Sequence, residues 1–405
     1  MDPAVANFDL LDAAHLRGVG SWKWTMFPDT IGAFVAEMDF GTAPAVTEAL
    51  HAAVGTGRFG YLPPALSAAM SEASAAWHRD AYGWSIGASQ VHPIADVLHG
   101  LEITIEHYSR PGPVILPTPA YMPFLEVPGT LGREIIQVPL LTSMTGGAHD
   151  ETGGRAYRLD LDGIDAAFRA GGTLLILCNH YNPVGTVFTA EELLAVSEVV
   201  ERHGGRVFSD EIHSPLVYPG ACHVPYASLS EVTAQHSVTA TSASKAWNLP
   251  GLKCAQIILT NDADATVWER IGFMASHRAS TLGVIANTAA LTSGRPWLQD
   301  VLGYLDGNRR LLADLVAEHL PGVRYVPPEG TYIGWLDCRE LQLDSPADFF
   351  RTEARVALTD GAACGPAGEG FVRMIFATPR PILEQAVTAM GAALTRRSLS
   401  LSSAP

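Results

Sequence analysis

The chain has 405 residues, of which 47 % are hydrophobic and 17 % are charged, so it is long enough for two or three packed units and too apolar for extended disorder. Asp and Glu number 42 against 26 Lys and Arg, and the resulting net charge of −16 disfavours nucleic acid and anionic membrane surfaces as partners. The five cysteines are widely spaced without a CxxC pair, and the N-terminus lacks the basic and apolar regions of a signal peptide, so we expect a cytoplasmic protein without disulfides, a metal site or a membrane span.

The first part of the chain predicts an arm followed by two helices. Residues 1–43 hold no long periodic segment, and Pro44 is suited to the first turn of a helix that continues to about Val54. An exposed loop containing Tyr61 follows. The Ala-rich segment from Leu66 to Tyr82 has its larger apolar residues at helical spacing and predicts an amphipathic helix.

From residue 89 the pattern changes to short apolar runs that alternate with helical segments of 10 to 15 residues. Such alternation favours an α/β fold with a largely parallel sheet covered by helices. The predicted strands are Val114–Leu116, Glu134–Val138, Thr173–Leu177, Arg206–Ser209, Ser237–Thr241 and Cys254–Leu259.

The C-terminal part predicts a smaller α+β unit. Helices near Ala263–Arg278 and Trp297–Leu320 lead into strand, helix, strand and helix at 331–336, 346–355, 371–376 and 381–394. The stretch 146–154, GGAHDETGG, predicts a surface insertion without assignable chemistry.

Three polar residues stand where predicted strands end, and ligands collect at the carboxyl ends of parallel strands. Asn182, Asp210 and Lys245 each follow an apolar run. A lysine at such a place can form a Schiff base if its amine is partly neutral, which burial and a second cation, here Lys253, would achieve.

The residues around Lys245 indicate a phosphate group. The hydroxyls of Ser242 and Ser244 and the ammonium of Lys253 are suitable donors to a phosphate dianion. A reactive lysine beside a phosphate site indicates pyridoxal phosphate as the cofactor.

Four motifs follow one another in a fixed order, and together they resemble the fold-type I pyridoxal-phosphate enzymes. The separations, 210 − 182 = 28 and 245 − 210 = 35 residues, are similar to those of the class I/II aminotransferase superfamily. The motifs are Asn182-Pro183-x-Gly185, Asp210-Glu211-Ile212-His213, Ser242-x-Ser244-Lys245 and Gly370-Phe371-Val372-Arg373.

Further stretches resemble the cystathionine β-lyase-like carbon–sulfur lyase branch of that superfamily. They are AEMDFGTAP (36–44), FGY (59–61), PAY (119–121), SDEIH (209–213), SKAWNLPGLK (244–253) and GTYIGWLD (330–337). The resemblance implies a large cofactor-binding domain (44–285) with a mostly parallel seven-stranded sheet and a smaller α+β domain (286–405) joined by the N-terminal arm (1–43). It also implies a homodimer with shared active sites.

The resemblance assigns roles around the cofactor ring. Lys245 would carry the Schiff base, and Asp210 would face the pyridine nitrogen, where a carboxylate keeps the ring protonated. Asn182 and His213 would donate to the phenolic oxygen, and Tyr121 would stack on the ring. We expect Lys245, Tyr121 and Asp210 to be the catalytic residues.

The phosphate would be bound at a helix that begins near residue 95 and continues to about His107. Backbone N–H groups of Ala95 and Asp96 would combine with Ser242, Ser244 and Lys253. Because a carboxylate beside a phosphate is unfavourable, the side chain of Asp96 should turn into the helix as a cap.

The remaining predicted residues would contact the substrate. Arg373 would bind its carboxylate with two parallel hydrogen bonds, Asp39 would line the same site, and Tyr61 would reach the phosphate and substrate from the partner subunit. His180 and Tyr181 replace the proline and histidine of relatives, so we expect them to hydrogen-bond a polar leaving group and shape substrate choice.

The implied reaction is α,β-elimination of a cysteine thioether or S-conjugate to thiol, pyruvate and ammonia, with Lys245 removing the proton at Cα. Three alternatives remain open. An aminotransferase and a decarboxylation-coupled oxidative deaminase of S-conjugates would use the same cofactor contacts. A regulatory protein-binding role would instead require an exposed apolar patch outside the active site.

Overall fold

The computed structural model describes residues 8–143 and 156–402, so the predicted insertion at 146–154 lies outside the described residues. A seven-stranded sheet forms the centre of the molecule, in the order β2-β10-β9-β8-β7-β3-β4. Strand β10 runs opposite to the other six strands, which all run in one direction, and this confirms the predicted α/β fold with a mostly parallel sheet. The strands are β2 (Val91–Ile94), β3 (Val114–Thr118), β4 (Ile135–Pro139), β7 (Leu174–Cys178), β8 (Arg206–Asp210), β9 (Ser237–Thr241) and β10 (Ala255–Ile258).

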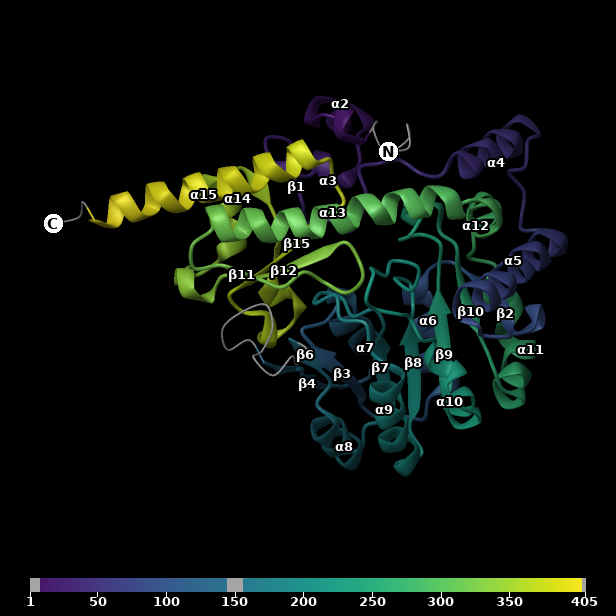
Figure 1. Cartoon of the computed structure of the whole chain (residues 1–405). Coiled ribbons are helices and arrows are strands. Elements are labelled where there is room, and N and C mark those ends of the chain that lie inside the picture. The colour runs from purple at the N-terminus through teal and green to yellow at the C-terminus, as the bar shows by residue number, and fades with distance from the viewer. Residues whose placement is uncertain (1–7, 144–155, 403–405) are drawn as a thin grey trace.

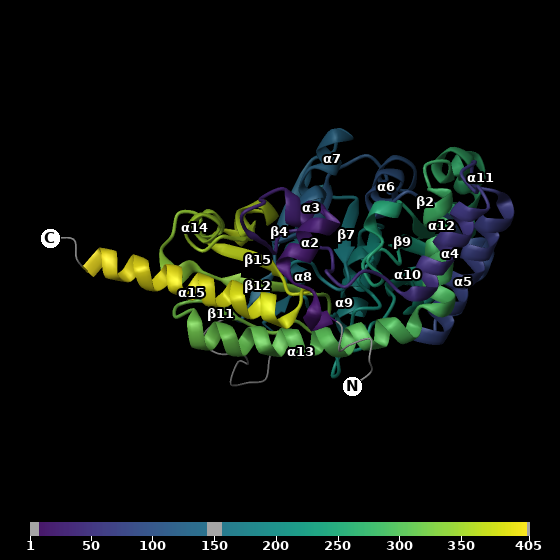
Figure 2. The same cartoon turned by 90° about the horizontal axis from the view of Figure 1, so that it is seen from above.

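Helices cover both faces of this sheet, as a view from above shows (Figure 2). Helices α6 and α7 lie on one side of the strands, and α8, α9 and α10 lie on the other. Apolar side chains of both helix layers and of the fully buried strands form one continuous hydrophobic cluster. These helices are α6 (Val97–Ile103), α7 (Val127–Thr130), α8 (Leu161–Arg169), α9 (Ala190–Arg202) and α10 (Glu231–His236).

One end of the molecule is built by α4, α5, α11 and α12, which gather beside β2 and β10 (Figure 1). The long helix α13 runs from α12 towards the smaller sheet and lies beside α15 in both views. The bounds are α4 (Pro44–Gly55), α5 (Pro64–Tyr82), α11 (Asp262–Ser276), α12 (Thr281–Ser293), α13 (Arg295–His319) and α15 (Arg380–Ser402).

The smaller unit contains an antiparallel sheet in the order β11-β12-β15-β14. A further strand pair, β1 with β13, packs in the same hydrophobic cluster as this sheet, whereas the pair of β5 with β6 follows β4 and packs with the large sheet. The elements of the smaller unit are β1 (Ile31–Gly32), β11 (Arg324–Tyr325), β12 (Ile333–Asp337), β13 (Val356–Ala357), β14 (Thr359–Asp360), β15 (Phe371–Ile375) and α14 (Pro346–Glu353), and the additional pair beside β4 is β5 (Leu141–Thr142) and β6 (Tyr157–Arg158).

The N-terminal segment is more regular than the predicted arm. It contains α2 (Ala13–Val19), which is capped by Asp12, and α3 (Trp22–Thr25). Its apolar residues, including Leu16 and Trp24, belong to the same hydrophobic cluster as the core of the smaller sheet. The predicted domain boundary at residue 285 falls inside helix α12, whereas that at residue 43 falls directly before α4. The division into three segments stays a prediction.

Strand direction decides which loops meet. Because β2, β3, β7, β8 and β9 are parallel, their carboxyl ends lie at one edge of the sheet. The antiparallel strand β10 begins at that same edge, so the residue pair Lys253-Cys254 that precedes it lies there too. Among the described helices, none combines the length and apolar character needed to cross a membrane.

Candidate active site

A cavity of about 160 Å³ lies at this edge of the large sheet. Its wall combines residues that follow β2, β3, β7, β8 and β9 with residues that precede β10, so segments far apart in sequence meet around one space. The predicted residues that line it are Ala95, Asp96, Tyr121, Asn182, Asp210, His213, Ser242, Ser244, Lys245 and Lys253.

The amine of Lys245 is held in this cavity by the N-terminal segment. Its Nζ donates to the carbonyl oxygen of Ala36 at 3.0 Å, and the hydroxyl of Tyr332 donates to the same oxygen at 2.9 Å. Burial and the nearby charge of Arg373 lower the pKa of Lys245 to about 8, so roughly a tenth of the amine is neutral at pH 7.

The second cation that lowers the pKa of Lys245 is therefore Arg373, and the expectation that Lys253 has this effect was wrong. The side chain of Lys253 is 60 % exposed, and its Nζ forms an ion pair with Asp96 at 2.9 Å. A solvated, paired ammonium has little influence on an amine elsewhere in the cavity.

Asp210 ends β8 with its side chain in the cavity wall. Its Oδ1 accepts from the backbone N–H of Ile212 at 3.1 Å, and the thiol of Cys178 donates to Oδ2 at 3.5 Å. Burial raises the pKa of Asp210 to about 6. A cationic group placed against this carboxylate would lower its pKa again, because an opposite charge favours the ionised form.

Asp96 caps a helix, as the sequence predicted. Its Oδ1 accepts from the backbone N–H of His99 at 2.9 Å at the start of α6, and its Oδ2 faces Lys253. The hydrogen bonds and the lysine charge outweigh burial and lower the pKa of Asp96. The carboxylate is thus turned towards its own helix and a cation.

Ser242 and Ser244, the two serines near Lys245, differ in their hydrogen bonds. The hydroxyl of Ser242 donates to the carbonyl oxygen of Cys254 at 2.7 Å and accepts from the N–H of Ser244 at 3.0 Å. Its proton is committed within the protein, so Ser242 shapes the turn that presents Ser244 and Lys245. Both serines line the cavity.

Three further side chains face the cavity between Lys245 and β3. Burial and the charges of Lys245 and Arg373 lower the pKa of His213 to about 3, so its ring is neutral, and its Nδ1 is buried without a hydrogen-bond partner among the described residues. Asn182 and Tyr121 lie in the same wall, and Tyr121 packs edge-on against Phe124.

Arg373 lies just outside the cavity lining. Its Nη1 donates to Oδ1 of Asn182 at 3.3 Å, and its Nη2 donates to the carbonyl oxygen of Phe34 at 3.0 Å and to Thr359 at 3.3 Å. The residue is buried, and its Nε has no partner within the described chain. The guanidinium is thus next to the cavity with donor capacity left.

Tyr61 is remote from the cavity in a single chain. Its side chain is 84 % exposed and packs against the ring of His277 at 5.1 Å between centroids. It lines a surface groove of about 900 Å³ together with the exposed Phe59 and Phe273. A role for Tyr61 in the cavity therefore requires a second copy of the chain.

Asp39 does not line the cavity. Its Oδ2 forms a buried ion pair with Lys23 at 2.8 Å, and its Oδ1 accepts from the indole N–H of Trp24 at 2.8 Å. Removing one partner of such a pair costs about 3 to 5 kcal/mol because it leaves an unpaired buried charge. Its paired carboxylate therefore stabilises the N-terminal segment, and its contact with the substrate stays a prediction.

His180 and Tyr181 also lie away from the cavity, which contradicts their expected contact with the substrate. Tyr181 is buried, and its hydroxyl donates to the carbonyl oxygen of Pro117 at 2.5 Å. The ring of His180 is fully buried and stacks on His223 at 5.1 Å between centroids. Both side chains pack beneath the strand end, whereas Asn182 reaches the cavity.

Two residues with evident roles escaped the sequence reasoning. The backbone carbonyl of Ala36 carries no side-chain signal, and Cys178 is one of several widely spaced cysteines. The position of Cys178 at the end of β7, directly beside Asp210 in the register of β8, was a signal that could have been used.

Fold and site together define an α/β protein with a half-buried lysine, a buried carboxylate and a capped helix start around one cavity. Among the described residues, no group of three or more His, Cys, Asp or Glu side chains is arranged to hold a metal ion.

Comparisons with known proteins agree with this description. Residues 31–390 match the family model for aminotransferase class I and II. A cystathionine β-lyase from Corynebacterium glutamicum is 37 % identical over 94 % of this chain and 98 % of its own length. A solved structure from Corynebacterium diphtheriae, described as a PLP-dependent β-cystathionase, has a TM-score of 0.88 at 38 % identity and covers 95 % of this chain and 98 % of that chain. The PLP-bound C-S lyase from Staphylococcus hominis has a TM-score of 0.85 at 27 % identity, covering 96 % and 99 %.

The chain therefore belongs to the aminotransferase class I and II family, in its cystathionine β-lyase-like branch of fold type I.

Proposed function

We propose that this protein is a pyridoxal-phosphate-dependent carbon–sulfur lyase that cleaves a cysteine thioether or S-conjugate to thiol, pyruvate and ammonia. The observation that carries the proposal is the cavity in which Lys245 and Asp210 both lie, the former with a pKa lowered to about 8. The relatives described as cystathionine β-lyase and C-S lyase support the reaction type.

The residues around the cavity fit the cofactor. Asp210 would face the ring nitrogen, and the unpartnered Nδ1 of His213 and the amide of Asn182 would meet the phenolic oxygen. Tyr121 would cover the ring. When bound, pyridoxal phosphate supplies an electron-accepting ring that stabilises the electron pair released at Cα of an amino acid.

The phosphate would lie at the start of α6. The backbone N–H groups of Ala95 and Asp96, the hydroxyl of Ser244 and the ammonium of Lys253 would surround it, while Ser242 shapes the turn. Lys253 forms an ion pair with the carboxylate of Asp96, and the same ammonium group would also bind the phosphate.

The substrate would be oriented by Arg373. Its guanidinium is held by Asn182 and Thr359 and would bind the substrate carboxylate, which fixes the direction of the bond from Cα to hydrogen. The partly neutral amine of Lys245 would then accept the proton from Cα. Loss of the thiolate from Cβ, followed by hydrolysis, gives thiol, pyruvate and ammonia.

A neighbouring cavity would receive the leaving group. This second cavity, of about 440 Å³, is lined by Glu37, Asp39 and residues of α2, and it shares Pro250 with the first. The charge of Asp39 is paired with Lys23, whereas Glu37 meets Lys23 only through its backbone carbonyl, at 3.4 Å. Glu37 is therefore the carboxylate available to a substrate.

A homodimer would complete the site. The exposed apolar side chains of Phe59, Tyr61, Phe273 and Met274 favour burial against a second copy, which would bring Tyr61 to the partner's phosphate site. The five cysteines are all free thiols, four of them buried, which supports the expected cytoplasmic location.

Incubation of the purified, cofactor-loaded protein with cystathionine, cysteine and bulkier S-conjugates tests the proposal. Equimolar thiol, pyruvate and ammonia is the expected result. Amino-group transfer to a keto acid without release of thiol would instead identify an aminotransferase, and carbon dioxide with peroxide would identify an oxidative deaminase.

A further inference from the structure

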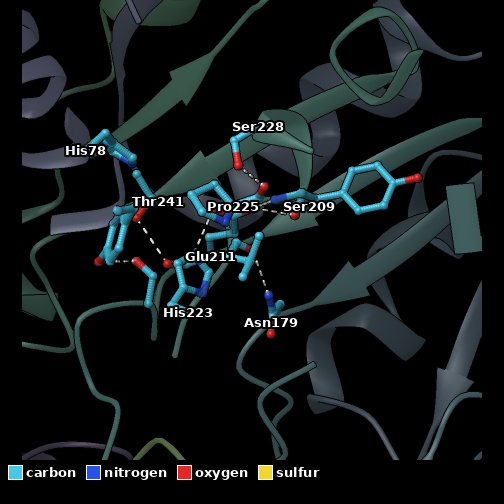
Figure 3. Close-up of polar contacts among 12 residues, drawn as sticks. His78, Asn179, Ser209, Glu211, His223, Pro225, Ser228 and Thr241 are labelled. Carbon is cyan, nitrogen blue, oxygen red and sulfur yellow. Dashed lines mark hydrogen bonds and ion pairs between the residues drawn. The ribbon is translucent and has the colours of Figure 1, made fainter. Parts of the chain in front are cut away.

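A second carboxylate, Glu211, follows Asp210 directly and is fully buried; Figure 3 shows it among its polar partners. Its Oε1 accepts from the hydroxyl of Ser209 at 2.8 Å and from the backbone N–H of Tyr226 at 2.9 Å. Its Oε2 lies 3.2 Å from Nε2 of His223. An ionised carboxylate satisfies all three contacts as an acceptor, and this arrangement is what keeps a charge stable away from water.

Glu211 also ties together the strand ends that form the cavity. Its backbone N–H donates to the carbonyl oxygen of Ala240 at 2.8 Å, and its carbonyl oxygen accepts from the hydroxyl of Thr241 at 3.1 Å. These bonds join the end of β8 to the end of β9, which leads to Lys245. A displacement of Glu211 would therefore move Asp210 and Lys245 together.

The loop after β8 extends this connection to β7. Asn179 donates from its backbone N–H to the carbonyl oxygen of Asp210 at 2.8 Å and from its side chain to the carbonyl oxygen of Val224 at 3.3 Å. Since His223 and Tyr226 contact Glu211, residues 223–226 connect the ends of β7 and β8; Figure 3 shows His223 and Asn179 on either side of this connection.

His78, Tyr82 and His180, which lie around the contact between Glu211 and His223, are uncharged near neutral pH. Burial lowers the pKa values of His78 and His180, and burial raises the pKa of Tyr82 to about 12. The titratable neighbours of Asp210 include Cys178 and Tyr121, whose pKa values burial raises, and Lys245. His223 is thus the titratable side chain that contacts the Glu211 carboxylate directly.

We propose that Glu211 is a positioning residue that holds Asp210 at the end of β8 and places a fixed negative charge beneath it, so that the cofactor ring nitrogen keeps its proton. This inference rests on the proposed binding of pyridoxal phosphate against Asp210. A negative charge in a medium of low dielectric stabilises a nearby cation over several ångströms, and the charge of Glu211 also raises the pKa of Asp210.

Glu211→Gln removes the charge and keeps the packing. The amide oxygen can accept from Ser209 and Tyr226 as the carboxylate does. The amide N–H₂ can donate to Nε2 of His223, because Nδ1 of that ring is unpartnered among the described residues and can take the proton instead. Glu198→Gln, on the exposed face of α9, is the matched control for loss of one negative charge.

The test loads the protein with pyridoxal phosphate labelled with ¹⁵N in the ring and follows the nitrogen shift against pH. In Glu211→Gln the pH at which the nitrogen loses its proton should fall by about one unit. The value of kcat should fall about tenfold, with KM changed less than about threefold. Glu198→Gln should match the wild type. Glu211→Met, a second neutral variant of similar volume, should shift the nitrogen in the same direction.

An unchanged nitrogen titration in Glu211→Gln, with a loss of thermal stability alone, would overturn the inference and leave Glu211 a structural residue. The proposed function fails separately, if Asp210→Asn leaves the nitrogen shift of the wild-type complex unchanged or if the wild type does not bind the cofactor.

Discussion

Lys245 donates from Nζ to the carbonyl oxygen of Ala36 at 3.0 Å, although the two residues are 209 positions apart in the chain. The N-terminal segment therefore closes the cavity over the amine. Exclusion of water by this segment and the charge of Arg373 keep the lysine partly neutral, as a nucleophilic amine must be.

The rate of cofactor capture by the apoprotein should depend on pH through Lys245. Only the free amine attacks the aldehyde, so the second-order rate should rise with pH and reach half its maximum near pH 8. In Arg373→Gln the midpoint should move upwards, by up to about one unit, because a repelling charge is lost. Stopped-flow absorbance measures the rate, and Arg79→Gln, an exposed change on α5, is the control. A midpoint above pH 10 in the wild type would contradict this prediction.

Asp210→Asn should stabilise the apoprotein at pH 7 while it impairs the loaded enzyme. The folded-state pKa of Asp210 is raised from 3.8 to about 6, so the free energy of unfolding falls as pH rises from 3.8 to about 6. Above this range the whole of that loss of stability is present. The asparagine variant avoids a cost of about 2 to 3 kcal/mol. Urea unfolding of the variant and the wild type at pH 7 and pH 4 measures this gain in stability. Most of the difference between the two proteins should disappear at pH 4. If the variant is less stable than the wild type at pH 7, the fold stabilises the ionised carboxylate and the prediction is wrong.

Hybrid dimers should recover activity if Tyr61 acts in the partner's site. A dimer of one Tyr61→Ala chain and one Lys245→Ala chain contains one site with both residues intact, so its activity should approach half that of the wild type. Differently tagged chains allow the hybrid to be purified, and the two parent homodimers are the controls. Activity no higher than that of the better parent would exclude the shared site.

Glu37 should favour S-conjugates with a cationic leaving group. Comparison of S-(2-aminoethyl)cysteine with the neutral S-propylcysteine should give a kcat/KM ratio that falls about fivefold to tenfold in Glu37→Gln, as expected for loss of a partly solvated charge contact. Glu198→Gln should leave the ratio unchanged. Equal ratios in wild type and Glu37→Gln would place the leaving group elsewhere.

The cavity was largely predictable because its residues follow apolar runs in a parallel sheet. In such a sheet, the position after a strand determines which side chains meet, and Asn182, Asp210 and Lys245 met as expected. Strand β2 was missed because His92 and Pro93 interrupt its short apolar run.

The direction of individual side chains was not predictable in the same way. The sequence predicts a substrate contact for Asp39, whereas its carboxylate forms an ion pair with Lys23, 16 residues earlier in the chain. His180 and Tyr181 precede Asn182 directly, yet they pack beneath the strand end. Likewise, the cation that lowers the pKa of Lys245 is Arg373 of β15, whereas Lys253 is nearer to Lys245 in the sequence.

The most direct test of the account is the identity of the lysine that binds the cofactor. The protein is loaded with pyridoxal phosphate, reduced with borohydride and digested, and the mass of each lysine-containing peptide is measured. The account predicts that the peptide containing Lys245 alone carries the added mass, and that Lys245→Ala neither retains the label nor releases thiol and pyruvate. A label on another lysine, or full activity in Lys245→Ala, would contradict it.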